Sequence, residues 1–570
     1  MTIVGLRRLS AVVAVLSGPL LLSVGAQQAE QGQKAVATAT HVMVSSSHPE
    51  VTRTALDVLR KGGNAVDAMI TAMMVQHILE PQMSTLAGGM GAMIYEAKSH
   101  KLYYLDAELD HTAKEAPITP IMAMASGVPD TSGRRIGVPG NVAGLYAAAE
   151  RFGTMKWADY FPPAIRVAEQ GFPMDSFLYA EMVSASLGRL GSVPSGRDEW
   201  MPDGFVPPVG TISKRPRLAK ALQRLAAEGP DYFYKGEWAH HFVDAVNATG
   251  GSMSLDDLAQ YRVRWEEPLR TTFRGLEIAT PAPPSDGGAF ITLVMNMAEQ
   301  FDFEELPYYT ESPKTLALLR KIFSAAEINV TEYVRDPLSS AVPVNTLISK
   351  DYAKTLARLI DGSWPLTTPA AAPAGEAYGP QPASDSSLHD PLYTDTNHLL
   401  IVDAMGNMVS VTHTVYGTTF ATGLVVDGVG VNSGNTFPGT ALGKGRRVVS
   451  PFPATIVMKD GQPWLAIGSP GLASKAVAIA LVNLLGFKKD LAASVDAPRF
   501  DGNQPTAMFQ VETRIPENVR DGLAPFGIPV QPTAPYNWHF GSVHAVMRDQ
   551  KTGTLTGVAD PRRAGSAAGY

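Results

Sequence analysis

The 570-residue sequence contains no cysteine. This excludes a thiol nucleophile, a thiolate zinc site and an iron–sulfur cluster, and no disulfide can stabilise the fold. Any nucleophile must therefore be a hydroxyl, an amine or a carboxylate. The stability of the protein has to come from burial of its apolar residues, which make up 45% of the chain.

The sequence also lacks a strong charge bias. It has 54 acidic and 47 basic residues, a formal net charge of -7, and no basic stripe along any predicted element. Because a nucleic-acid backbone requires clustered Lys and Arg, we do not expect a nucleic-acid partner.

Only one long apolar stretch is present, and it lies at the N-terminus. Residues 11–24 follow Arg7 and Arg8, and small residues precede Gln27. A short apolar run with Gly and Pro in its centre is typical of a cleaved secretion signal rather than of a membrane anchor. We therefore predict a signal peptide at 1–26 and a periplasmic or secreted mature protein without a membrane span.

The first part of the chain alternates between helix and strand signals. Capping residues and apolar periodicity predict helices at 49–61 and 65–79, with strands at 92–96 and 101–106. Gly88-Gly89-Met90-Gly91 lacks the Gly-Lys-Ser/Thr ending of a phosphate loop and precedes a strand, so it indicates close backbone packing.

Three further segments differ in composition. Residues 27–40 are polar and rich in alanine, which predicts disorder, and residues 137–360 are predicted to be mainly helical. Residues 362–394 are rich in Pro, Ala, Ser and Gly and have no periodic apolar face. This composition predicts a mobile surface segment.

The last third of the chain is rich in short β-type runs. They are predicted at 399–403, 408–413, 424–427, 454–459, 464–468, 544–549 and 555–558, with helices at 474–485 and 516–526. Strand-rich runs with helices on both sides in the sequence indicate sheets covered by helices.

The segment Asp395-Thr396-Asn397-His398 carries the strongest chemical hypothesis. A threonine hydroxyl is a poor nucleophile unless a base lies beside it. Cutting the chain before Thr396 would free its α-amine, which can serve as that base. The alternative is that Thr396 is only a good strand former in a β-rich region.

No metal or organic cofactor is expected. The pair His240-His241 lies near Glu237 and Asp244, but the spacing matches no established ligand pattern. We interpret the pair as part of a helix surface.

Seven sequence blocks follow one another in an order that resembles the γ-glutamyltransferase family (glutathione hydrolases), within the N-terminal-nucleophile hydrolases. They are Gly62-Gly63-Asn64-Ala65-Val66-Asp67-Ala68, Gly137-Val138-Pro139-Gly140 with Val142-Ala143-Gly144, Pro283-Pro284-Ser285-Asp286-Gly287-Gly288, the Thr396/His398 segment, Gly468-Ser469-Pro470-Gly471, Ala497-Pro498-Arg499-Phe500 and Asp560-Pro561-Arg562. Each block alone is weak evidence, but the collinear series is strong.

The resemblance implies an α/β fold, a four-layer αββα sandwich of the N-terminal-nucleophile hydrolase type, formed jointly by two fragments of one precursor. The cleavage site would lie between Asp395 and Thr396. The large subunit would span 27–395, with 362–395 as a mobile linker before the cleavage point, and the small catalytic subunit 396–570.

The resemblance also implies roles for four catalytic residues. Thr396 would cleave the precursor and then attack the substrate, and Thr414 would hold the Thr396 hydroxyl in place. Gly471 matches one of two backbone N–H donors of an oxyanion hole. Leu472 would supply the second donor, where the family has another glycine; removing one such donor typically costs roughly 3 kcal/mol of barrier.

The expected acyl pocket departs from the family at several places. Glu108 stands where the family has an arginine that clamps the donor carboxylate, and Tyr416 stands where it has an asparagine. Gly434 lies in a stretch that lacks the family's acid. Of an adjacent serine pair, Ser450 is kept and the second position is Pro451. We take these five as candidate substrate-binding residues with altered specificity, because a carboxylate in place of an arginine removes a strong pairing and adds repulsion.

Other basic residues are candidates for a replacement clamp, although a slip of the alignment in one loop is an alternative to a changed pocket. These candidates are Arg134, Arg135, Lys444, Arg446 and Arg447.

We therefore expect an exported, self-processing threonine amidohydrolase that cleaves, and can transfer, an acyl group from a γ-glutamyl-type or related amide. An ordinary γ-glutamyltransferase with a rearranged pocket is the alternative within the class. A non-catalytic periplasmic binding protein that kept the fold is the alternative from another class. The expected partners are a small amide or peptide substrate and the two fragments, which would form a heterodimer.

Overall fold

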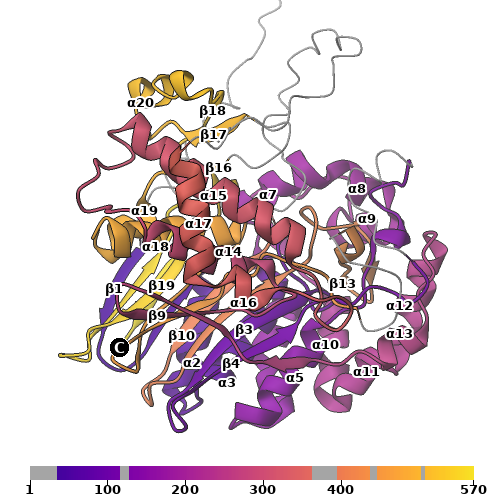
Figure 1. The fold of residues 1–570 in the computed structure, drawn as a ribbon. Helices are drawn as coiled ribbons and strands as arrows, with labels where there is room; N and C mark the ends of the chain where they lie inside the picture. The colour runs from indigo at the N-terminus through magenta and orange to yellow at the C-terminus, as the bar shows by residue number, and fades with distance from the viewer. Residues whose placement is uncertain (1–34, 116–126, 363–394, 437–445, 502–507) are drawn as a thin grey trace, which may run out of the picture.

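The computed structural model of the protein describes residues 35–115, 127–362, 395–436, 446–501 and 508–570 (Figure 1). The predicted signal peptide and the predicted linker, apart from the two end residues of the linker, lie outside this part of the chain. Among the described residues, no helix has both the length and the apolar character needed to span a membrane.

Two seven-stranded sheets, each antiparallel throughout, form the centre of the molecule. In spatial order, the first contains β1 (Ala35–Ala39), β20 (Leu555–Ala559), β19 (His544–Arg548), β15 (Gln462–Gly468), β14 (Thr455–Lys459), β9 (Leu276–Thr280) and β8 (Leu269–Phe273). The second contains β21 (Ser566–Gly569), β2 (Met43–Ser46), β10 (Asn397–Val402), β11 (Met408–Thr414), β3 (Gly89–Glu96), β4 (Lys101–Ala107) and β7 (Arg264–Glu266).

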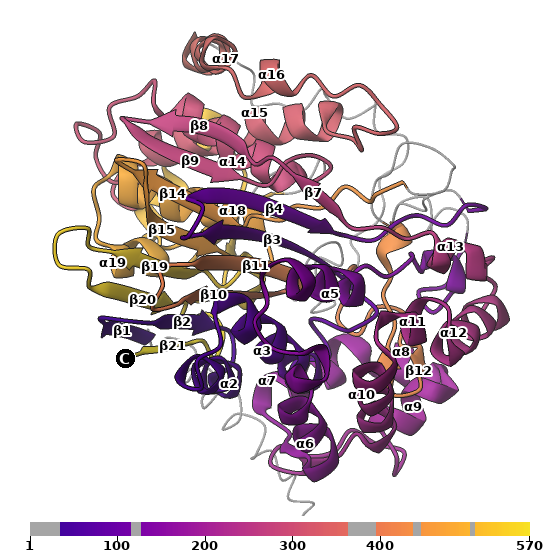
Figure 2. The same cartoon turned by 90° about the horizontal axis from the view of Figure 1, so that it is seen from below.

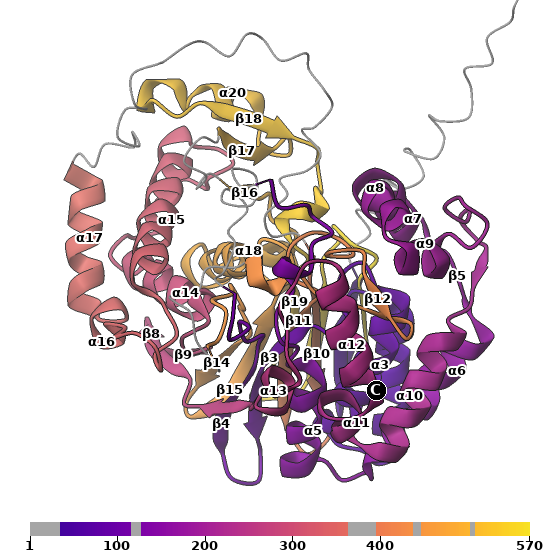
Figure 3. The ribbon, with the colours of Figure 1, turned by 90° about the vertical axis from the view of Figure 1, so that its right-hand side faces the viewer.

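The sheets pack face to face and helices cover their outer faces. Contacts between the sheets join β11 and β10 to β15 and β19. On the first sheet lie α14 (Asp286–Ala298), α18 (Ala473–Leu481) and α19 (Leu491–Asp496), with α15 (Pro313–Tyr333) and α17 (Lys350–Gly362) beyond α14. On the second lie α2 (Pro49–Arg60), α3 (Ala65–Leu79) and α5 (Asn141–Phe152). Figure 3 shows α15 and α17 on one side of the strands and α3 on the other. The predicted αββα sandwich is confirmed.

In both sheets, strands formed by residues before Thr396 are hydrogen-bonded to strands formed by residues after it. β10 and β11 lie between β2 and β3, while β20, β19, β15 and β14 lie between β1 and β9. Each side of the predicted cleavage point therefore contributes central hydrogen-bonded strands, and neither part can complete a sheet alone.

The two predicted N-terminal helices are confirmed. All residues of α3 are buried, and the helix begins with a capping box in which Asn64 and Asp67 satisfy each other's backbone N–H groups. Asp67 also accepts a 2.7 Å hydrogen bond from the Tyr160 hydroxyl. The Gly62–Ala68 block thus fixes where the central helix begins.

One prediction about a larger segment is wrong, and a second is incomplete. Residues 35–39, predicted to be disordered, form β1, because they pair with β20 more than 500 residues away (Figure 2). Residues 137–360 are mainly helical, as predicted, but they also contain β7, β8 and β9, which extend both sheets. β1, β7 and β9 pair with strands far along the chain, which local composition does not report, whereas β8 pairs with β9 in a local hairpin.

Two smaller predictions are shortened by the structure. The run at 424–427 contains only the two-residue strand β12 (Val425–Val426), paired with β13 (Val429–Gly430). The helix expected at 516–526 is α20 (Glu517–Asp521), followed by a separate 3₁₀ turn.

The glycine-rich entry to β3 packs closely against β11, as predicted. A Cβ at Gly88 would lie 2.0 Å from the carbonyl oxygen of Thr414. The Gly88 carbonyl also accepts hydrogen bonds from the backbone N–H groups of Gly140 and Asn141, at 2.9 and 3.0 Å. The Gly137–Gly140 block and the glycine-rich segment therefore meet beside the end of β11.

We predict that Gly88→Ala lowers the free energy of unfolding by about 1–3 kcal/mol, because the added methyl group overlaps backbone that cannot move freely. Urea denaturation would measure the change. Gly188→Ala is the matched control, because Gly188 is exposed in α8 (Leu187–Ser192) and has no atoms within 4 Å of an added Cβ. Equal stability of the two variants would contradict the packing argument.

Candidate active site

Thr396 directly precedes β10, in the middle of the second sheet. Asn397 pairs with His413 across β10 and β11, so the register brings Thr396 beside Thr414. The side chain of Asn397 accepts a hydrogen bond from Ser47 at 3.0 Å and donates one to Ser84 at 3.0 Å. The residue after the candidate nucleophile is therefore fixed by two other segments.

Two hydroxyl groups converge on the Asp395 carbonyl. The Thr414 hydroxyl donates to the Asp395 carbonyl oxygen at 2.7 Å, and the Thr396 Oγ1 atom contacts the same oxygen. The two threonine Oγ1 atoms are 3.3 Å apart. The peptide bond after Asp395 thus lies beside a potential nucleophile, and its carbonyl is polarised by a second hydroxyl.

The Thr414 hydroxyl is itself oriented by the backbone. It accepts a hydrogen bond from the Tyr416 N–H at 3.0 Å, where the chain leaves β11 with a left-handed residue (Tyr416 φ 62). Since the oxygen accepts from Tyr416, its proton is available for the Asp395 carbonyl.

Gly471 and Leu472 form a turn at the start of α18. Gly471 has φ 72, and an added Cβ would lie 2.8 Å from Gly541 Cα. Both the positive φ and the lack of space for a side chain therefore require glycine. The Leu472 N–H points to the His539 carbonyl at 3.3 Å. Gly471 borders the cavity that contains Thr396, whereas the Leu472 N–H is engaged with His539 in this uncleaved chain.

The cavity at Thr396 is small, about 20 Å³, which is close to the space of one water molecule. Its wall brings together most of the predicted site residues. It is lined by Asp395, Thr396, Thr414, Tyr416, Ser450, Pro451, Phe452, Gly471 and Ala473.

Glu108 is buried beside this cavity and does not face solvent. Its carboxyl accepts from the Tyr104 hydroxyl at 3.1 Å and is hydrogen-bonded to the Ser450 hydroxyl. Burial, reinforced by Asp106, raises the pKa of Glu108 well above its ordinary value. The shift acts against the negative charge at this position, and Glu108 offers no guanidinium donor.

Gly434 lies apart from the cavity wall, in a buried 3₁₀ turn. A Cβ there would lie 1.9 Å from Leu109 Cδ1, and the Gly434 N–H donates to the Asn432 side chain at 2.9 Å. The same Asn432 side chain bonds the backbone of Ala87 and Gly137. This stretch therefore ties three loops together behind the site.

The basic residues considered as a replacement clamp are placed elsewhere, and Lys444 lies outside the described residues. Arg447 is buried and pairs with Asp106 at 3.0 Å and Asp110 at 2.8 Å. Arg134 and Arg135 form ion pairs with Glu115 and Asp130. Arg446 comes directly after residues 437–445, which lie outside the described part of the chain. Its carbonyl accepts a hydrogen bond from the His111 N–H. None of the four borders the cavity at Thr396.

Arg563 is a site residue that the sequence analysis missed. Its guanidinium donates to the Thr396 carbonyl at 2.7 Å, and the residue is 3% exposed. Burial lowers the pKa of Arg563 to about 10, so it stays a cation at neutral pH. Arg563 directly follows the Asp560-Pro561-Arg562 block, and this position in the sequence is the signal that could have identified it.

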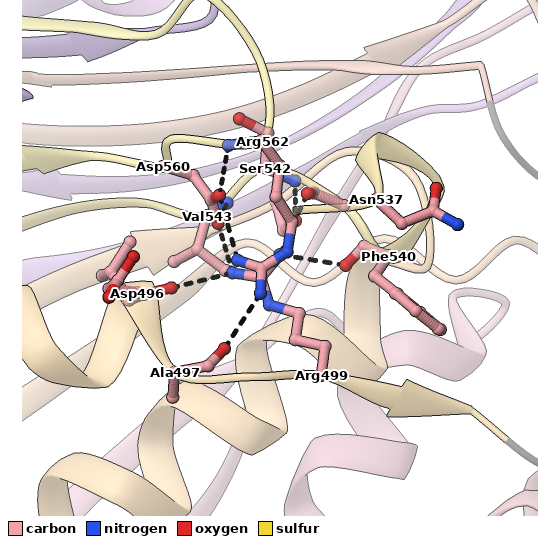
Figure 4. Close-up of polar contacts among 12 residues, drawn as sticks. Asp496, Ala497, Arg499, Asn537, Phe540, Ser542, Val543, Asp560 and Arg562 are labelled. Carbon is pink, nitrogen blue, oxygen red and sulfur yellow. Dashed lines mark hydrogen bonds and ion pairs between the residues drawn. The ribbon is translucent and has the colours of Figure 1, made fainter. Parts of the chain in front are cut away.

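The two C-terminal sequence blocks meet in one buried ion-pair cluster. Arg499 is hydrogen-bonded to Asp560 and donates to the carbonyls of Phe540 and Gly541 at 3.0 and 2.9 Å (Figure 4). Arg562 pairs with Asp560 at 3.2 Å and with Glu512 at 2.7 Å.

This cluster supports the turn beneath the Gly471 loop. Burial raises the pKa of Asp560, but Arg499 and Arg562 outweigh it and hold the pKa below the ordinary value. Because Arg499 fixes the Gly541 carbonyl, it also fixes the backbone against which Gly471 packs.

The pair His240-His241 lies exposed on α12 (Glu237–Ala248), on a helix surface as predicted. His241 lies 2.8 Å from the Asp427 carboxylate on an exposed surface. Among the described residues, no group of three or more His, Asp or Glu side chains could hold a metal ion.

Comparison with known proteins places this geometry in a family context. The family model for gamma-glutamyltranspeptidase matches residues 51–570. The glutathione hydrolase proenzyme of Bacillus subtilis (strain 168) is 31% identical over 546 residues, covering 92% of this chain and 91% of that protein. The acylase ACY 1 proenzyme of Pseudomonas sp. (strain SE83) is 30% identical over 548 residues, covering 92% and 93%. The crystal structure of cephalosporin acylase from Bacillus halodurans matches with a TM-score of 0.80 at 25% identity, covering 95% of this chain and 97% of that one.

We predict that Arg499→Met lowers the free energy of unfolding by about 3–5 kcal/mol, because it leaves buried carbonyls and part of the Asp560 charge without a partner. Chemical denaturation would measure the loss. Arg270→Met is the matched control, since Arg270 pairs with Glu277 on an exposed surface and little change is expected. A similar small change in both variants would show that the buried cluster does not hold the turn.

Proposed function

The chain belongs to the γ-glutamyltranspeptidase family, a family of enzymes that hydrolyse γ-glutamyl or other acyl amides, and from this premise we propose that it is an exported, self-processing hydrolase whose nucleophile is Thr396. The observation that supports this most directly is the convergence of the Thr396 and Thr414 hydroxyls on the Asp395 carbonyl. A strand-forming threonine without a chemical role would not require this arrangement.

The first reaction is cleavage of the precursor. The Thr396 hydroxyl attacks the Asp395 carbonyl carbon, and the Thr414 hydroxyl donates to the oxygen as it becomes negative. The C–N bond then breaks, the proton of the hydroxyl goes to the leaving nitrogen, and Asp395 is held as an ester. Water hydrolyses the ester, which leaves a carboxylate on Asp395 and a free α-amine on Thr396.

The second reaction uses the new α-amine. It accepts the Thr396 hydroxyl proton as the hydroxyl attacks a substrate amide, and it returns a proton to the leaving amine. Water, or another amine in a transfer reaction, then releases the acyl group from the ester. The Gly471 N–H is the candidate donor for the substrate oxyanion, and Leu472 would join it once its contact with His539 is exchanged for the substrate oxygen.

The two products of cleavage would remain together as a heterodimer of 27–395 and 396–570. Strands of both products alternate in both sheets, so separation would expose the backbone hydrogen-bonding groups of the central strands. Export rests on the signal-like sequence at 1–26.

The acyl group is proposed to differ from a standard γ-glutamyl group. Glu108 fills the position of the expected arginine with a buried carboxyl that is already hydrogen-bonded to Tyr104 and Ser450, and burial raises its pKa. Pro451 and Tyr416 replace two polar ligands. An ordinary γ-glutamyl hydrolase with a rearranged pocket is the second candidate, favoured by the 31% identity to a glutathione hydrolase proenzyme.

We predict that Thr396→Ala abolishes both cleavage and turnover, because it removes the hydroxyl that attacks in both reactions. A denaturing gel and intact mass would show one uncut chain, whereas the unchanged protein should give two fragments, the smaller beginning at Thr396. Thr418→Ala, a nearby half-buried threonine, is the control and should still cleave. Cleavage of the Thr396→Ala protein, or a stable single chain in the unchanged protein, would refute the proposal.

We predict that γ-glutamyl-p-nitroanilide is a poorer substrate than at least one anilide that lacks the α-amino-acid group, such as pentanoyl- or glutaryl-p-nitroanilide. The reason is the missing guanidinium partner for the α-carboxylate. Release of p-nitroaniline gives kcat/KM for each compound. Faster turnover of the γ-glutamyl compound than of all the others would favour the second candidate.

A further inference from the structure

A second cavity, of about 260 Å³, lies next to the small cavity at Thr396. Pro451, Gly471 and Ala473 border both cavities. The remaining wall comes mainly from α14, α15 and α18. A group joined to a carbonyl at Thr396 can therefore extend past the Gly471 turn into this larger space.

Most of the wall is apolar. It is formed by Phe290, Val330, Val334, Val449, Pro451 and Leu472. Two of these residues, Pro451 and Leu472, stand at positions where the related family has serine and glycine. Both departures from the family, Pro451 and Leu472, thus add apolar surface to the second cavity.

The segment between the cavities is held firmly in place. The Ser285 hydroxyl donates to the carbonyls of Ser450 and Phe452, each at 3.1 Å, and the Asp286 N–H donates to the Ser450 carbonyl at 3.1 Å. A Cβ at Gly287 would lie 2.5 Å from the Phe452 carbonyl oxygen. The start of α14, which carries Asp286 into the cavity wall, is therefore fixed relative to Pro451.

The charged groups of the wall are unequally paired. The Lys475 ammonium pairs with Asp501 at 2.9 Å and Glu327 at 3.7 Å. Arg335 donates to the carbonyls of its own helix end. Among the described residues, no side chain lies within ion-pair or hydrogen-bond distance of the Asp286 carboxyl, although that carboxyl borders the cavity.

When Asp286 is ionised, the balance of charge around it is negative. Three carboxyl groups, Asp286, Glu327 and Asp501, face the two cations Lys475 and Arg335. Burial and the charge of Glu327 raise the pKa of Asp286 to about 7, against the effect of Lys475. A cation brought in by a ligand would restore neutrality, whereas an anion would add to the excess.

We propose that the second cavity binds the far end of the acyl chain of the substrate, and that Asp286 selects a chain that is apolar along its length and ends in an ammonium group. The proposal rests on the proposed function of Thr396. It assigns the cavity to the acyl side because Asp395, which supplies the acyl carbonyl during self-cleavage, borders the adjoining small cavity.

The test compares p-nitroanilides of three acids of similar length, with one leaving group throughout. These are 5-aminopentanoyl-, pentanoyl- and glutaryl-p-nitroanilide, assayed with the purified two-fragment protein. We expect kcat/KM to fall in that order, with an advantage of about tenfold or more for the ammonium over the neutral chain, as for a charge-assisted contact in a partly dry site.

Two variants test the charge of Asp286 and the volume of the second cavity separately. Asp286→Asn should lower kcat/KM for the 5-aminopentanoyl compound to about the value for the pentanoyl compound, because the side chain keeps its size but loses its charge. Val330→Trp should fill the cavity and slow both long chains while sparing acetyl-p-nitroanilide. Ile328→Trp is the matched control, because Ile328 lies on the same helix, α15, and is 53% exposed.

The outcomes distinguish the two proposals. A single uncut chain without turnover contradicts the proposed function itself. Two fragments that hydrolyse the anilides without an ammonium preference contradict only the role of Asp286. Equal loss with acetyl and long acyl groups in Val330→Trp would overturn the assignment of the cavity to the acyl chain.

Discussion

The pairing of β10 with β11 is the constraint on which the rest of the site depends. The register that sets Asn397 opposite His413 also places the Thr396 hydroxyl 3.3 Å from that of Thr414. Both strands are central, between β2 and β3, so they are held by hydrogen bonds on each side and by packing on both faces. A candidate nucleophile directly before such a strand is fixed without needing a rigid loop.

Glycines and buried arginines then bring the loops to this strand pair. Gly88 allows backbone to approach the Thr414 carbonyl, and Gly471 allows the α18 turn to approach Gly541. Arg499 and Arg562 hold the Gly541 turn through Asp560 and Glu512. These charges are almost fully buried, and each is tolerated because it has a charged partner and carbonyl acceptors. The sequence blocks that carried the family resemblance are therefore mostly parts of one support for the Thr396 site.

The sequence predicted the helices and strands that have strong local signals. α2, α3, β3, β4, β10 and β11 were found because helix caps and apolar β-type runs between turn residues specify them locally. β1, β7 and β9 were missed because they pair with strands far along the chain, and β8 was missed although it forms a local hairpin with β9. Among site residues, Thr396, Thr414 and Gly471 were identified from motifs, whereas Arg563 and Asp286 gain their roles from what lies beside them.

The sequence by itself determined the chemistry that is possible: a chain without cysteine, a threonine that the family motifs mark as the candidate for self-cleavage, and the residues that stand at the positions of the expected acyl ligands. The tertiary structure decided how those residues act. Burial raises the pKa of Glu108, whose carboxyl is hydrogen-bonded to Tyr104 and Ser450, and Arg447, a candidate clamp, is committed to Asp106 and Asp110. The charge of a side chain and the groups it can contact depend on its solvent exposure and its neighbours, and only the folded chain determines these.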